Sequence, residues 1–180
     1  MDRWTLPNKL NVCGNDYGIN ADFRDILDII GYLSTKESDD VFIALSLFYT
    51  NSEIPPDLQA AINAMYDFIA LGEKDDGKPA QKLIDWDQDA LMIIADVNKV
   101  SGQELRAEKF VHWWTFMGFF NGIGEGQLST IVGIRAKRAK GKKLEKWERE
   151  FYKEHKNEIN FRVERTDEEE ARIIAELDAI

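Results

Sequence analysis

The chain has 180 residues and a formal net charge of −10, because 33 Asp and Glu outnumber 23 Lys and Arg. Its 44% apolar residues suffice for a sizeable core, which excludes a disordered or fibrous chain, and its acidity argues against a dedicated nucleic-acid binder. A single cysteine excludes an internal disulfide and a Cys-based zinc site, and the lack of a signal-peptide core or a run of about 18 apolar residues predicts a cytosolic protein.

The first elements predicted are a short β-hairpin and a helix. Apolar and polar residues alternate on both sides of Gly14-Asn15-Asp16, which predicts a hairpin over residues 8–20. Two strands are short for an independent sheet, so we expect the hairpin to pack on a helix or to join a neighbouring subunit. A helix with one apolar stripe follows over 21–33, with Asn20 as its N-cap.

Two more segments lead to a polar loop. Residues 39–50, which Ser38 can cap, are almost continuously apolar and show no clear helical period, so helix and strand both stay open there. The Pro-Pro pair at 55–56 opens a helix that ends at Gly72. The stretch 72–79 is polar and is the best candidate for a flexible break in the chain.

The middle of the chain contains the most apolar segment. Asp85 is expected to cap a helix through Val100, which Gly102 terminates. Residues 110–120 follow, and eight of these eleven residues are large and apolar, six of them aromatic. They spread around the whole helical wheel, so this helix is expected to be buried on all sides, in the core or partly against a partner.

The last third is more polar. A helix is predicted over 127–140, and a charged helix with few apolar contacts over 144–155. A capping box at Thr166 and Glu169 starts an amphipathic helix over 166–179.

Together these elements predict a mainly α protein without internal repeats or low-complexity tracts. We expect residues 1–155 to form a compact helical domain that begins with a β-hairpin. Residues 156–180 are expected to form a C-terminal amphipathic helical tail that docks loosely or frays.

Three alternating carboxylates, Asp85, Asp87 and Asp89, have the spacing of a calcium loop. That loop also needs glycine at its sixth position and a bidentate glutamate at its twelfth, where this chain has Ala90 and Asp96. Carboxylates at a helix start are favoured by the helix dipole in any case. Helix capping is therefore the preferred interpretation, and we expect no metal site.

His112 is a candidate catalytic residue only because histidine side chains titrate near neutral pH. It lies on an apolar helix without a Ser, Cys or carboxylate arranged as a nucleophile system, so a hydrogen-bonded core or interface histidine is the better interpretation. We therefore expect no enzymatic activity, no catalytic residue and no cofactor.

A basic run starts at Arg135 and is followed at once by glutamates, which makes a mixed-charge, solvated helix. We favour an electrostatic face for an acidic segment of another protein or another copy over a grip on nucleic acid. The run consists of Arg135, Lys137, Arg138, Lys140, Lys142, Lys143 and Lys146.

Six motifs in this order carry a resemblance to a known family. They are Leu6-Pro7; Val12-x-Gly14-x-x-Tyr17-x-Ile19-x-x-Asp22-Phe23-Arg24; Leu47-Phe48-Tyr49; Asp85-Trp86-Asp87-x-Asp89-Ala90; His112-Trp113-Trp114-x-Phe116; and Ile134-Arg135. Over about residues 6–155 the chain resembles the bacteriophage gene-product-fifteen family, small proteins encoded just upstream of the tape-measure gene in long-tailed phages.

This resemblance implies a tail-assembly chaperone. Such a protein would coat the tape-measure protein in the host cytoplasm, help to recruit the tail-tube protein, form homo-oligomers and be absent from the finished virion. A client-binding groove could be lined by the aromatic helix and the helix before it. The candidate partner-binding residues are Trp86, Trp113, Trp114, Phe116, Phe119, Phe120, Arg135 and Trp147.

Core packing alone is at least as good an explanation for most of these side chains. Two other functions also stay open: a structural tail component, such as a completion or connector protein, and a nucleic-acid-associated regulator that uses the basic run.

Overall fold

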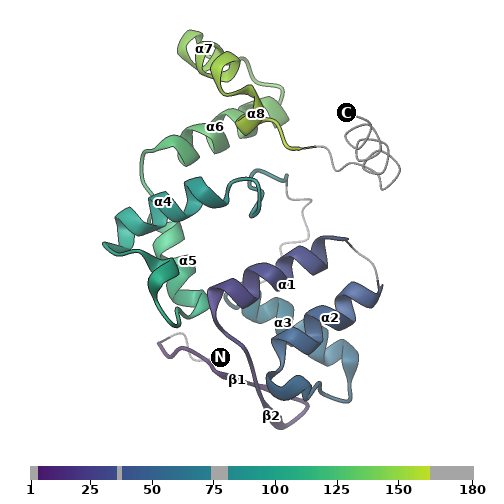
Figure 1. Cartoon of the computed structure of the whole chain (residues 1–180). Coiled ribbons are helices and arrows are strands. Elements are labelled where there is room, and N and C mark those ends of the chain that lie inside the picture. Colours follow the sequence, from purple (N-terminus) through teal and green to yellow (C-terminus); the bar gives the residue numbers. More distant parts are fainter. Residues whose placement is uncertain (1–3, 36–37, 74–80, 163–180) are drawn as a thin grey trace, which may run out of the picture. The chain divides into compact units, whose positions relative to one another are not determined.

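The computed structural model of the chain describes residues 4–35, 38–73 and 81–162 (Figure 1). The protein is mainly helical with an N-terminal two-stranded antiparallel hairpin, as the sequence predicts. It divides into two compact units. The N-terminal unit comprises residues 1–80 and 92–126, and the C-terminal unit comprises residues 81–91 and 127–180.

The hairpin pairs β1 (Lys9–Val12) with β2 (Asn15–Gly18). Its turn consists of Cys13 and Gly14, whose φ angles of 51° and 89° are both positive. Two positive φ angles are typical of the tight turns that match the twist of a hairpin. The turn therefore lies one residue earlier than the predicted Gly14-Asn15-Asp16, and β1 packs on helix α3 as expected.

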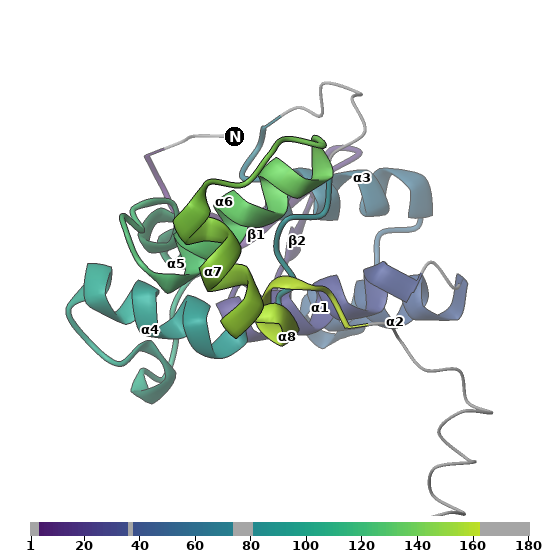
Figure 2. The ribbon, with the colours of Figure 1, turned by 90° about the horizontal axis from the view of Figure 1, so that it is seen from above.

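The N-terminal unit is otherwise helical, and α1 and α2 lie beside each other (Figures 1 and 2). Its helices are α1 (Phe23–Thr35), α2 (Ser38–Phe48), α3 (Leu58–Ile69), most of α4 (Ala90–Ser101) and α5 (Trp113–Asn121), with short 3₁₀ turns η1 (Thr50–Ser52) and η2 (Leu105–Ala107). The segment after Ser38 is thus a helix and not a strand.

The starts of α1 and α3 differ from the prediction because a different side chain caps each helix. The Asp22 carboxylate accepts the N–H of Arg24 at the start of α1, while the predicted cap, Asn20, donates its side-chain amide to Leu47 O at 2.7 Å. At α3 the helix starts after Asp57, whose Oδ1 accepts the N–H of Ala60.

The C-terminal unit contains α6 (Gln127–Ala139), α7 (Lys146–Glu154) and the short α8 (Lys156–Ile159). Asp85 does not cap α4 directly: its Oδ1 accepts the N–H groups of Asp87 and Gln88 in a turn, and the helix starts at Ala90. The predicted end of this helix is confirmed, since Gly102 has a φ of +74° directly after Ser101.

The predicted tail is only partly described. Residues 156–162 belong to the C-terminal unit, whereas the capping box at Thr166 and the amphipathic helix over 166–179 lie outside the described residues. The division after residue 155 therefore stays a prediction. Across residues 4–35, 38–73 and 81–162, no helix has the length and apolar character that crossing a membrane requires.

Candidate partner-binding site

The start of α1 is joined to the residues before α5 by a charged network. Asp22 Oδ2 accepts the backbone N–H of Val111 at 2.9 Å, and Arg24 binds both oxygens of Asp22 at 2.7 and 2.8 Å. The same guanidinium donates to the backbone oxygens of Glu108 and Lys109. Two of the sequence motifs, Asp22-Phe23-Arg24 and the one beginning at His112, therefore meet at this point.

The environment of Asp22 favours its charged form. Burial by itself raises the pKa of this carboxyl, but hydrogen bonds from the Arg24 side chain and from the N–H groups of Val111 and Arg24 outweigh burial and lower it. The network therefore holds an ionised, almost buried carboxylate between two parts of the N-terminal unit.

His112 is a structural residue of the N-terminal unit. Its Nδ1 accepts the backbone N–H of Trp114 at 3.0 Å, so the imidazole is the N-cap of α5. The ring proton therefore lies on Nε2, which donates to Pro7 O at 3.0 Å. This confirms the prediction of a hydrogen-bonded core histidine and ties the N-terminal segment to α5.

The two adjacent tryptophans of α5 stabilise the end of α3. The indole N–H of Trp113 donates to Ile69 O at 2.9 Å, and that of Trp114 donates to Phe68 O at 3.0 Å. Carbonyl groups in the last turn of a helix lack a partner within the helix, and the Trp113 indole supplies one for Ile69 O. The Trp114 indole is a second donor to Phe68 O, which also accepts the backbone N–H of Leu71.

Most of the aromatic helix belongs to the core of the N-terminal unit. Trp113 and Phe116 are each 1% exposed, and Phe116 stacks on Phe23 with ring centroids 4.6 Å apart. Phe119 and Phe120 are half-buried. The expectation of burial on all sides is wrong at the start of the segment, where Phe110 is 59% exposed.

An exposed aromatic surface lies at this end of α5, and we call it the aromatic edge. It consists of Leu6, Phe110 and Trp114. The rings of Phe110 and Trp114 both contact the His112 ring, and Leu6 precedes the proline whose carbonyl binds the same histidine. Leu6 and Phe110 are exposed and Trp114 is half-buried. Of its residues, only Trp114 is among the predicted partner-binding residues, so Leu6 and Phe110 are candidates that the sequence reasoning missed.

Arg135 has a different position from the one predicted. It is almost fully buried in the C-terminal unit and binds the Asp89 carboxylate in a bidentate pair, at 2.5 and 2.9 Å. Its remaining donors bind the backbone oxygens of Leu83, Glu158 and Ile159. Arg135 therefore does not contribute to an external electrostatic face, since its charge is neutralised inside the unit.

The same internal role explains the motif around Asp89. The side chain of Gln88 donates to backbone oxygens between residues 157 and 160 and accepts the N–H of Arg162. The motifs that contain Asp89 and Arg135 thus meet in this unit and hold residues 157–162 against it.

The other two predicted site residues of this unit differ in exposure. Trp86 is half-buried, whereas Trp147, in the first turn of α7, is 57% exposed. Next to Trp147, Glu148 is buried and pairs with Lys137 at 2.6 Å. Trp147 is therefore a second candidate for partner contact.

The carboxylates at 85–89 show no metal-binding arrangement. Asp89 faces Arg135, and Asp85 pairs with Lys82 and caps its own turn. In the part of the chain that the structure describes, no group of three or more His, Cys, Asp or Glu side chains is placed to hold a metal ion.

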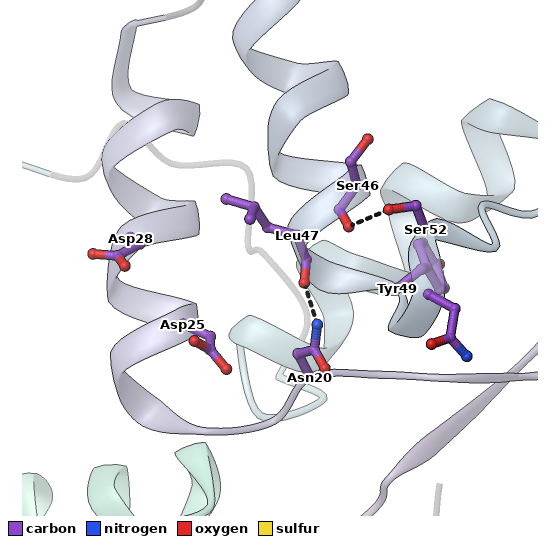
Figure 3. Close-up of a pocket in the computed structure, with 8 residues that line it drawn as sticks. Asn20, Asp25, Asp28, Ser46, Leu47, Tyr49 and Ser52 are labelled. Atoms are coloured by element: carbon purple, nitrogen blue, oxygen red, sulfur yellow. Dashed lines mark hydrogen bonds between the residues drawn. The ribbon is translucent and has the colours of Figure 1, made fainter.

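A polar pocket of about 290 Å³ lies between α1 and the end of α2 (Figure 3). Asp25 and Asp28 line one side, and Asn20, which donates to Leu47 O, lies at its base. Burial, and then the charges of Asp22 and Asp28, raise the pKa of Asp25. The pocket is lined by Asn20, Asp25, Asp28, Ser46, Leu47, Tyr49, Asn51 and Ser52, a set without a cationic side chain.

Sequence reasoning missed the outer side of α2. Phe42 is 57% exposed, and Ile43 and Leu47 are each 40% exposed, while Ala44, Leu45 and Phe48 form the buried side. The sequence did contain a signal for this exposed apolar side. A helix that is apolar on both sides has no polar stripe and therefore shows no helical period, and no such period is visible in this segment.

Comparison with known proteins identifies the family. A family model described as Bacteriophage Gp15 protein matches residues 4–161. No curated protein and no solved structure matches the chain. Because the match spans well over half of its length, the chain belongs to the bacteriophage Gp15 protein family.

Proposed function

We propose that this member of the family, a phage structural or assembly protein, is a tail-assembly chaperone. It binds the tape-measure protein, keeps it soluble during tail-tube assembly and associates with copies of itself. It acts in the host cytoplasm without enzymatic activity or cofactor, contacts the tail-tube protein, and leaves before the virion is complete. The family match carries the proposal, together with the resemblance to proteins encoded beside the tape-measure gene.

The aromatic edge supports a chaperone role physically. Its side chains present apolar area without a catalytic arrangement beside it, and exposed apolar surface of this kind marks interaction sites. Aromatic anchors contribute most to such contacts, and an amphipathic client helix would cover them with its apolar side. The strong negative charge of the chain would keep a complex with an apolar client in solution.

Co-expression with a tape-measure fragment tests the proposal. Wild-type protein should keep the fragment soluble. The double variant Leu6→Asp/Phe110→Asp should return it to the pellet, because aspartate at these two exposed positions removes apolar contact area from the aromatic edge. Leu58→Asp is the matched control, since Leu58 is exposed on α3, away from the aromatic edge, and should retain full activity. A fragment that stays insoluble with wild-type protein would contradict the proposal.

Mass spectrometry of purified virions separates the chaperone from the alternative, a structural tail component. The chaperone should be missing from the particles. A stoichiometric amount would favour a completion or connector protein instead.

A further inference from the structure

The described surfaces of the two units differ in charge. Among the described residues, the N-terminal unit has five Lys and Arg against fourteen Asp and Glu, a net charge of −9. Over residues 81–91 and 127–162, the C-terminal unit has twelve Lys and Arg against eight Asp and Glu, a net charge of +4, and residues 163–180 add two Arg against seven Asp and Glu. The difference between the described surfaces favours contact between unlike surfaces of two copies and disfavours contact between like surfaces.

The negative unit has an exposed apolar centre on α2. We call it the α2 face, made of Phe42, Ile43 and Leu47. Asp39 lies on the same side of the helix, and Asp25 and Asp28 lie across the pocket from Leu47 (Figure 3). From residue 25 to residue 73, the described part of the chain contains eight Asp and Glu and no Lys or Arg.

The C-terminal unit has a matching apolar centre on α7, where bases are in local excess. We call it the α7 face, made of the exposed Trp147 and the half-buried Phe151 one helical turn later. Exposed acids are interleaved here (Glu145, Glu150 and Glu154), but exposed bases outnumber them. These bases are Lys140, Lys142, Lys143, Lys146, Arg149 and Lys153.

We propose that the α2 face of one copy binds the α7 face of a second copy, head to tail. The apolar centres cover each other, and the carboxylates of α1 and α2 lie opposite the bases around α7. This contact uses two different surfaces, so each pair leaves one α2 face and one α7 face for further copies. This inference rests on the self-association in the proposed function and names the two surfaces that form the contact. Repeated head-to-tail contacts would line up copies in a row along an extended client.

Light scattering of the full-length protein, without client, tests this inference. The average mass should rise with protein concentration from the 20.7 kDa monomer and fall when NaCl is raised from about 50 to about 500 mM, because salt screens the charges. Phe42→Lys and Trp147→Glu should each remain monomeric. Their equal mixture should reach about twice the monomer mass and stop there, since only one competent pair of faces is left.

Tyr66→Lys on α3 and Leu91→Glu in the C-terminal unit are matched controls at exposed apolar positions and should associate like the wild type. A wild type that stays monomeric, or single variants that associate normally, would overturn the inference. So would a mixture that stays monomeric while the wild type associates, because that points to one self-complementary surface. The tape-measure assay is read separately, so a protein that solubilises its client as a monomer would lose this inference and keep its chaperone role.

Discussion

The Asp22 carboxylate makes the N-terminal unit sensitive to acid. The pKa of Asp22 is lower in the folded protein than in the unfolded chain. As the pH falls below about 4, the unfolded chain therefore binds the proton first, and the free energy of unfolding decreases until the pH has passed the pKa of the folded protein. Asp22→Asn should cost about 1–3 kcal/mol at pH 7, because a buried, charge-assisted hydrogen-bond network is broken. Denaturant unfolding at several pH values should show this difference shrinking in acid. Asp67→Asn, at an exposed position on α3, should change little at any pH.

Tyr49 acts at the other end of the pH scale. Its buried hydroxyl donates to Ala61 O at 3.0 Å, and burial, followed by the charge of Tyr17, raises its pKa to about 12. Stability should therefore fall as pH rises above about 10, where the unfolded chain releases the proton and the folded chain retains it. Tyr49→Phe should lower stability by about 1 kcal/mol at pH 7 and flatten this alkaline slope. An unchanged slope in the variant would assign the alkaline loss to another group.

At the scale of elements, α5 depends on one imidazole for two connections. His112→Ala removes the N-cap and the bond to Pro7, so it should cost about 1–2 kcal/mol and expose the Trp114 amide to hydrogen exchange. His112→Asn can still cap the helix and should protect that amide, while the N-terminal segment exchanges faster in both variants. Equal exchange at Trp114 in the two variants would show that the cap does not control this helix.

The order of the elements was predictable because it depends on local pattern, whereas their ends and contacts depend on distant partners. The hairpin and the helices after it follow from apolar spacing and turn residues. The cap of α1 moved from Asn20 to Asp22 because Val111, 89 residues away, also binds this carboxylate. The partners of the Trp113 and Trp114 indoles are backbone carbonyls, which any residue supplies, so no sequence pattern announces them.

At the scale of the whole molecule, the family motifs proved to be internal connections. The motifs around Asp22 and His112 meet in the N-terminal unit, and those around Asp89 and Arg135 meet in the C-terminal unit. Arg135 stands within a run of exposed bases, and only the fold shows that Asp89, 46 residues earlier, buries it. Leu6, Leu47 and Trp114 belong both to these motifs and to the surfaces left for partners, whereas the other residues of those surfaces lie outside the motifs.

The two units should also respond separately to a change in their interiors. Arg135→Lys keeps the charge but cannot reproduce the bidentate pair with Asp89 or the bonds to the carbonyls near α8, so it should destabilise the C-terminal unit by about 3–5 kcal/mol. Hydrogen exchange should then rise in α6 to α8 and stay unchanged in α5, whose core lies in the other unit. Arg149→Lys, at an exposed position on α7, should have no such effect. A uniform rise in hydrogen exchange across both units would mean that they unfold as one cooperative structure. A variant in one unit would then change the stability of both units together.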